Sequence, residues 1–209
     1  MTISAREALA RLKEGNQRFV SGVRSLEALV SHTRRAELAN EQNPIAIVLG
    51  CSDSRVPAEV VFDQGLGDLF VIRVAGNIVA PSQVGSVEFA VARFGTPLVV
   101  VLGHSQCGAI LATLEEVSRA TSHSPNVRSI VDRIRPSVET LLSIGAPRDP
   151  QALVQQAVRA NVRASADHLR HGSALLERFI ADNRLHVVGA EYSLESGTVE
   201  FFDGVAELI

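Results

Sequence analysis

The chain has 209 residues, 46% hydrophobic and 21% charged, which suits one globular α/β domain with a sizeable core. Its 20 basic and 23 acidic residues give a net charge of −3, which argues against a nucleic-acid partner. The longest apolar runs, 45–49 and 98–102, fall far short of the about 20 residues that cross a membrane, so no membrane partner is expected.

The N-terminal segment MTISAREALARLKEGNQRF lacks the apolar stretch of a secretory signal. Its periodicity predicts an amphipathic helix over 4–20, with Ala8, Leu9 and Leu12 toward the core. A polar helical stretch is expected to follow, so that residues 1–40 form an N-terminal helical arm. The expected compartment is the cytoplasm.

Strands and helices alternate through the rest of the chain, which predicts a single domain over 1–209. The expected architecture is a mostly parallel β-sheet covered by helices on both faces, with an antiparallel hairpin at the C-terminal edge. The predicted strands cover 45–49, 69–74, 98–102, 186–193 and 198–202, the last two joined by a turn at 195–197. The predicted helices begin with a short one at Pro57 and continue over 83–94, 105–120, 127–143 and 150–181, the last broken near Gly172, with a loop over 121–126.

Two cysteines, Cys51 and Cys107, are too few for a disulfide framework and could be buried bystanders, a redox pair or metal ligands. Cys51 directly follows one predicted strand, and His104 follows another. Because ligands of parallel sheets bind beyond the carboxyl ends of the strands, this position favours metal ligands over bystanders.

The two local clusters GCSDSR (50–55) and GHSQCG (103–108) carry the predicted chemistry. His104 and Cys107 are three residues apart at a turn that enters a helix, so both can face one ion, and Cys107 is expected in the first helical turn, where the helix dipole favours a thiolate. Two cysteines and one histidine are an attested catalytic zinc set that leaves a fourth position for water. These residues therefore predict a Zn²⁺ site.

Asp53 and Arg55 lie two and four residues after Cys51. They could form an ordinary surface ion pair, which stabilises little. A loop that folds back would instead bring them to the open side of the metal, where a carboxylate held by arginine orients the reactive water. Their closeness to Cys51 favours the second interpretation.

The motif C-x-D-S-R followed by H-x-x-C resembles the signature of the β-class carbonic anhydrases. Further similar segments are VPAEVVFDQGLGDLFVIRVAGN (56–77), GSVEFAV (85–91) and GAEYSLESG (189–197), so the resemblance covers most of the chain. It implies zinc on Cys51, His104 and Cys107, with Asp53 and Arg55 as the catalytic dyad.

The resemblance also implies a substrate pocket and an assembly. The matching pocket positions are Gln42, Phe70, Phe89 and Gly108, and Phe89 stands where family members often have tyrosine. Relatives of this kind are homodimers or larger homo-oligomers, with the pocket at a subunit boundary and the N-terminal arm on the partner.

The implied reaction is the reversible hydration of carbon dioxide to bicarbonate and a proton, by attack of zinc-bound hydroxide. In some family members the aspartate becomes a fourth zinc ligand in a closed form, a role that would fall to Asp53. No histidine stands out as the proton shuttle; those outside the metal set are His32, His123, His168, His171 and His186.

Two other functions remain open at this point. The same chemistry could hydrolyse COS or CS₂, and a non-catalytic zinc or redox-sensing module could release metal when Cys51 and Cys107 oxidise. The Asp53–Arg55 pair argues against the module, because a closed structural zinc site needs four protein ligands and no such pair.

Overall fold

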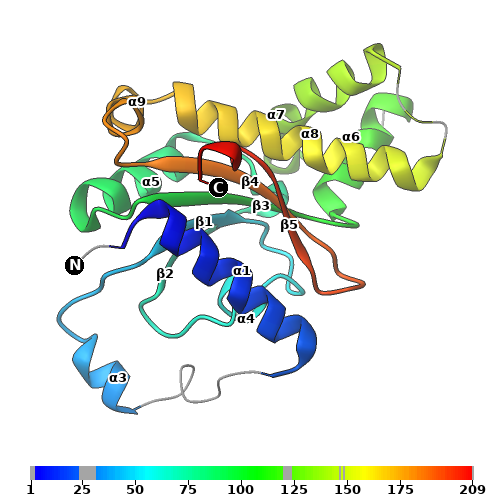
Figure 1. Cartoon of the computed structure of the whole chain (residues 1–209). Helices are drawn as coiled ribbons and strands as arrows, with labels where there is room; N and C mark the ends of the chain where they lie inside the picture. The colour runs from blue at the N-terminus through cyan, green and yellow to red at the C-terminus, as the bar shows by residue number, and fades with distance from the viewer. Residues whose placement is uncertain (1–2, 24–31, 120–123, 146, 148, 209) are drawn as a thin grey trace.

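The computed structural model describes residues 3–23, 32–119, 124–145, 147 and 149–208, and its strands form one sheet in the order β2-β1-β3-β4-β5 (Figure 1). The strands are β1 (Ala46–Gly50), β2 (Leu69–Arg73), β3 (Leu98–His104), β4 (His186–Tyr192) and β5 (Val199–Asp203). Strands β2, β1, β3 and β4 pair in parallel, and β5 pairs antiparallel with β4. The predicted sheet with its antiparallel edge hairpin is confirmed.

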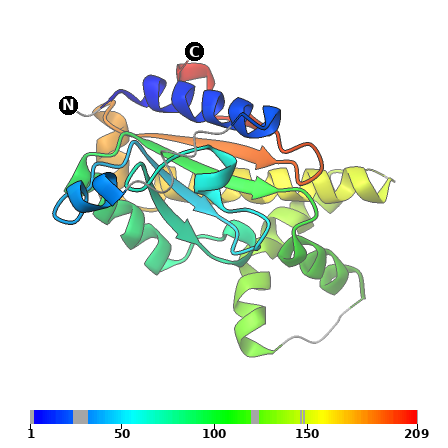
Figure 2. The same cartoon turned by 90° about the horizontal axis from the view of Figure 1, so that it is seen from below.

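Helices cover both faces of this sheet, as predicted. The described helices are α1 (Ala5–Ser21), α3 (His32–Glu37), α4 (Ala58–Val61), α5 (Pro81–Phe94), α6 (Gly108–Arg119), α7 (Pro125–Ser143), α8 (Pro150–His171) and α9 (Ala174–Ala181), with 3₁₀ turns η1 (Ala75–Asn77) and η2 (Ala206–Leu208). Helices α1 and α4 lie on one face and α5, α8 and α9 on the other, while α6 and α7 pack with α8 in a third cluster beyond the ends of the strands (Figures 1 and 2). None of the described helices is long and apolar enough to span a membrane.

The apolar run of β1 is continuous because both of its faces are buried. Ala46 and Val48 pack in the cluster on the α1 side, whereas Ile47 and Leu49 pack in the cluster on the α5 and α8 side. Strand β3 alternates in the same way, so the central strands are held from both sides. This rigid centre fixes the carboxyl ends of β1 and β3.

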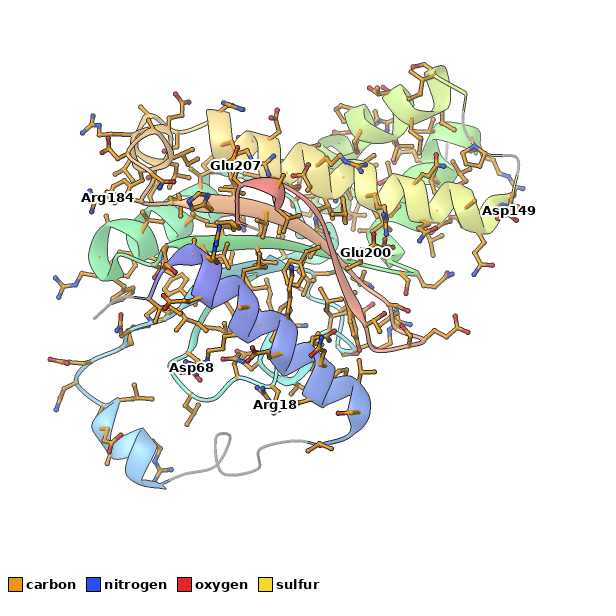
Figure 3. All side chains as sticks on the ribbon, in the orientation of Figure 1. Arg18, Asp68, Asp149, Arg184, Glu200 and Glu207 are labelled. Carbon is orange, nitrogen blue, oxygen red and sulfur yellow. The ribbon has the colours of Figure 1, made fainter. Side chains whose placement is uncertain are left out.

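Helix α1 packs its apolar face on the chain's own sheet. Ser4 caps it, since its hydroxyl accepts from the Glu7 N–H while the Glu7 carboxylate accepts from the Ser4 N–H. Leu12 is fully buried. Arg18, labelled in Figure 3, lies in the last turn of α1 and donates to Asp63 at 2.6 Å. Contact of the arm with a partner subunit stays a prediction.

Three helix starts differ from the predictions by two or three residues, and the first is α5, which begins at Pro81, two residues before the predicted start. Helix α7 begins at Pro125 inside the predicted loop, because Ser124 caps it by accepting from the Val127 N–H at 3.4 Å and proline fits the first turn. Helix α6 begins at Gly108, so Cys107 lies just before the helix and not in its first turn. Residues 24–31, which lie between α1 and α3, and residues 121–123 of the predicted loop lie outside the described residues.

Candidate metal centre

The strand order creates a crevice at the carboxyl ends of β1 and β3. From β1 the chain passes to β2 on one side, and from β2 it crosses back to β3 on the other side of β1. At such a switch point the two connections diverge and leave room for a ligand. Cys51 is the first residue after β1, and His104 is the last residue of β3.

Cys51, His104 and Cys107 meet in this crevice. Their candidate ligand atoms all lie within 4.8 Å of one another, and all three residues are buried. His104 Nδ1 lies 2.9 Å from the Ser105 carbonyl oxygen. Because a carbonyl oxygen only accepts, Nδ1 carries the proton, and the lone pair of Nε2 is left for a metal.

The residues present fit a zinc ion. His104 Nε2 is fully buried, yet it has no hydrogen-bond partner among the described residues. A buried nitrogen of this kind is costly unless it has a partner, and a metal ion supplies one. Two thiols and one imidazole are ligands that zinc prefers.

The two sulfur atoms differ in acidity because they share a proton. A hydrogen bond from the Cys107 thiol is the largest of the effects that lower the pKa of Cys51 to about 4. The same contact, followed by burial, raises the pKa of Cys107. A divalent cation would replace the shared proton and favour both thiolates.

Cys107 is the N-terminal cap residue of α6. Its carbonyl oxygen accepts from the Leu111 N–H at 3.0 Å, and the N–H groups of Ala109 and Ile110 act to lower the pKa of its thiol. A helix N-terminus stabilises a thiolate, so α6 has the predicted kind of effect on Cys107. Cys107 receives it as the residue that precedes the helix and not as a residue of its first turn.

Asp53 and Arg55 form a two-pronged ion pair beside these ligands. Arg55 Nε donates to Asp53 Oδ1 at 2.9 Å and Nη2 to Oδ2 at 2.7 Å, while the Arg55 backbone N–H also donates to Oδ1 at 3.0 Å. These bonds, led by the side-chain contact, hold the pKa of Asp53 well below its usual value. Asp53 Oδ2 lies 3.9 Å from His104 Nε2, so an ionised carboxylate faces the ligand cluster.

Two residues that the sequence did not predict hold Cys51 in place. Arg73, the last residue of β2, donates from Nε to the Cys51 carbonyl at 3.1 Å and from Nη2 to the Asp53 carbonyl at 2.6 Å. The Gly76 N–H donates to Cys51 Sγ at 3.3 Å. A charged residue that ends an apolar strand beside the cysteine loop was an available signal for Arg73, whereas no local signal marks Gly76.

The predicted pocket residues fall in two places. Gly108 directly follows Cys107, and a side chain built on it would meet nothing within 4 Å, so the space beside this ligand is open. Phe70 and Phe89 instead form a ring cluster with Phe94, with centroids 5.7–6.4 Å apart, and Phe89 is 56% exposed.

Gln42 lies at the opposite end of β1 from the metal ligands. It precedes the strand and lines a surface groove with Arg93 and Phe94. The five residues of β1 separate this end from Cys51 by about 16 Å, the rise of a strand of that length. Within one subunit, Gln42 therefore lies near the phenylalanine cluster and far from the candidate metal ligands of the same subunit.

Comparisons with known proteins agree on one family. The family profile described as "Carbonic anhydrase" matches residues 46–199. Carbonic anhydrase 2 of Mycobacterium tuberculosis is 40% identical over 197 residues, covering 94% of this chain and 92% of that protein. The carbonic anhydrase of Mycolicibacterium smegmatis is 41% identical over 189 residues, covering 90% and 89%.

Solved structures give the same result. The β-carbonic anhydrase CcaA superposes with a TM-score of 0.74 at 28% identity, covering 95% of this chain and 89% of that one. A tetrameric β-carbonic anhydrase from Sordaria macrospora gives a TM-score of 0.73 at 25% identity, covering 80% and 84%. The fold and site together define the class: a mostly parallel sheet with a buried Cys-His-Cys cluster at its switch point, a ligand set that suits a metal ion.

The chain belongs to the carbonic anhydrase family, in its β class. The function of that family is the zinc-dependent hydration of carbon dioxide, and the predicted activity is confirmed at this level.

Proposed function

We propose that Cys51, His104 and Cys107 hold the catalytic zinc ion of this carbonic anhydrase. The observation that carries the proposal is the buried, unpartnered Nε2 of His104 within 4.8 Å of the two thiol groups. Zinc supplies Lewis acidity, which allows a water molecule to lose its proton near neutral pH. The Ser105 carbonyl fixes the tautomer of His104 that offers Nε2.

Asp53, held in place by Arg55, would orient the attacking water by accepting a hydrogen bond from it. Support comes from the depressed pKa of Asp53, since an ionised carboxylate accepts and does not donate. Arg55 holds both carboxylate oxygens in a fixed plane, and the geometry leaves Oδ2 toward the ligand cluster. The same pairing keeps Asp53 from serving as the fourth zinc ligand of a closed form, a role that Asp53 would take if Arg55 released it.

The Gly108 N–H is available to bind an oxygen of bicarbonate. It belongs to the first residue of α6, whose leading N–H groups have no partner within the helix. A Cβ built on Gly108 would meet nothing within 4 Å, so the space beside this residue, next to Cys107, is open. Because backbone donors at a helix start stabilise negative charge, this group suits the oxygen that gains charge as carbon dioxide becomes bicarbonate.

The remaining pocket residues act in a homodimer or larger assembly. Gln42, Phe70 and Phe89 cluster around the edge strand β2, and Phe89 exposes an apolar ring there. A second copy, placed with its metal centre against this surface, would combine an apolar wall for carbon dioxide with an amide for its oxygen. In that assembly the N-terminal arm, residues 1–40, would also lie on the partner.

The two cysteines are free thiols, which supports the cytoplasm as the compartment. The substrate pair in this proposal is carbon dioxide and bicarbonate.

Zinc analysis combined with a stopped-flow assay of carbon dioxide hydration tests the assignment. Cys51→Ala, His104→Ala and Cys107→Ala should each lose zinc and activity together. A variant that kept near-stoichiometric zinc and normal turnover would remove its residue from the ligand set. Assays on COS and CS₂ with the same samples decide whether those gases are substrates.

A further inference from the structure

The sulfur of Cys51 is contacted by a backbone group from a tightly held turn. The Gly76 N–H donates to Cys51 Sγ at 3.3 Å from within η1. Gly76 has a φ of +69°, and a Cβ there would come within 2.8 Å of Ile134 Cδ1 and 3.0 Å of Ala109 Cβ. Only glycine fits this position. Because glycine can adopt many backbone torsion angles, other contacts are needed to hold the turn in one conformation.

Helix α8 removes that freedom from behind the turn. Asn161 Nδ2 donates to the Gly76 carbonyl oxygen at 2.8 Å. One helical turn later, Ser165 Oγ donates to the Asn77 carbonyl oxygen at 3.0 Å. Asn161 and Ser165 are both buried. Asparagine has a lower helix propensity than alanine, so helix formation does not explain Asn161. The hydrogen bond of Asn161 to the turn does.

We propose that Asn161 is a positioning residue for Cys51, acting through Gly76. The hydrogen bond from Asn161 holds the Gly76 carbonyl oxygen and so restricts the torsion angles of Gly76. Because these angles are restricted, the Gly76 N–H stays directed at Cys51 Sγ. The inference rests on the proposed role of Cys51 as a zinc ligand. Groups that hydrogen-bond to metal ligands orient them and tune the metal, and their loss costs about 10- to 100-fold in metal affinity.

A hydrogen bond to a thiolate also changes how strongly the sulfur donates electrons to a metal. This gives a readout that a purely structural role of Asn161 would not move. In the protein loaded with Co(II), the thiolate-to-cobalt charge-transfer band reports sulfur donation directly. When the Gly76 N–H moves away, donation increases and the band should shift to longer wavelength.

The test uses Asn161→Leu, which keeps the branched shape of the side chain with some added bulk and removes the amide. Asn161→Ala, which places a better helix former in α8, is the second variant if the first fails to fold. Ser165→Ala is the matched control, because it releases Asn77 from the same helix and leaves the Gly76 bond intact. Zinc affinity is measured by competition with a chelator, and folding by circular dichroism.

The expected result is about tenfold weaker zinc binding and a shifted band in the Asn161 variants, with Ser165→Ala close to the wild type in both. Wild-type affinity and an unshifted band in a folded Asn161 variant would overturn the positioning role alone. Equal losses in the Asn161 and Ser165 variants without a band shift would overturn it too, in favour of general support of the turn. If the wild type showed no thiolate-to-cobalt band at all, the assignment of Cys51 as a ligand would fail first.

Discussion

Gln42 and the metal ligands lie at opposite ends of β1, which makes a hybrid dimer a decisive test of where the complete site forms. One subunit carries Cys107→Ala and therefore has a defective metal centre. The other carries Gln42→Ala and has an intact metal centre but no amide to offer. If Gln42 serves the partner's metal, the intact metal centre meets the intact Gln42 across the interface.

The expected magnitudes follow from this geometry. A hydrogen bond to a charged oxygen contributes about 1.5–3 kcal/mol, so Gln42→Ala alone should lower kcat/KM by about 10- to 100-fold. Cys107→Ala alone should leave almost no activity. Each hybrid dimer, however, holds one complete site out of two and should regain about half of the wild-type activity per dimer.

The assay uses two different affinity tags to purify hybrids, followed by stopped-flow carbon dioxide hydration. The matched control pairs a Cys107→Ala/Gln42→Ala double variant with a wild-type subunit, a combination that leaves no complete site across the interface. If that control kept about half of the activity while the hybrid of single variants stayed inactive, the site would lie within one chain, and the proposed dimer pocket would be wrong.

Three further predictions concern the metal centre. Arg55→Ala should keep its zinc yet turn Asp53 toward the metal, so a Co(II) spectrum that matches the wild type together with normal turnover would contradict the holding role of Arg55. The pKa of Asp53 is lowered in the fold, so its ionised form stabilises the protein above the ordinary pKa of about 3.9, and that contribution is lost as the pH falls toward the lowered value. The excess unfolding free energy of the wild type over Asp53→Asn should therefore shrink below about pH 4, as urea titrations at several pH values would measure. Removal of zinc by a chelator should leave His104 Nε2 buried without a partner, at a cost of about 1–3 kcal/mol. Scanning calorimetry should therefore find that Tm falls by at least about 2 °C in the wild type and by much less in Cys107→Ala.

The strands and most helices could be predicted because their patterns are local. Strand β1 is marked by a run of apolar residues, and α5 has Pro81 in its first turn and Gly95 just after its end. Both signals lie within a few residues of the element they predict. The start of α7 was misplaced because Ser124 and Pro125 look like loop residues, although together they form a helix cap. Cap chemistry and loop chemistry use the same residue types, so the sequence alone separates them poorly.

The residues around Cys51 divide in the same way. Asp53 and Arg55 could be singled out because they follow Cys51 within four residues. Asn161 could not, because it reaches the cysteine only through Gly76, which is 85 residues away in the chain. Gly103, next to His104, allows α8 to pack closely, since a Cβ there would lie 2.5 Å from Val162.

Sheet register explains why these distant pieces meet at one sulfur. Gly50 pairs with Arg73 on β2 and with Leu102 on β3, so Cys51 leaves its strand where β2 ends and two residues before β3 ends at His104. Arg73 then reaches the Cys51 carbonyl from one side, while His104 arrives from the other. Because side chains alternate along a strand, a slip of one residue in either pairing would turn His104 or Arg73 to the opposite face. The two motifs therefore supply the proposed ligands, but the register of three parallel strands, fixed by the buried residues of β1 and β3, brings their ligand atoms within 4.8 Å of one another.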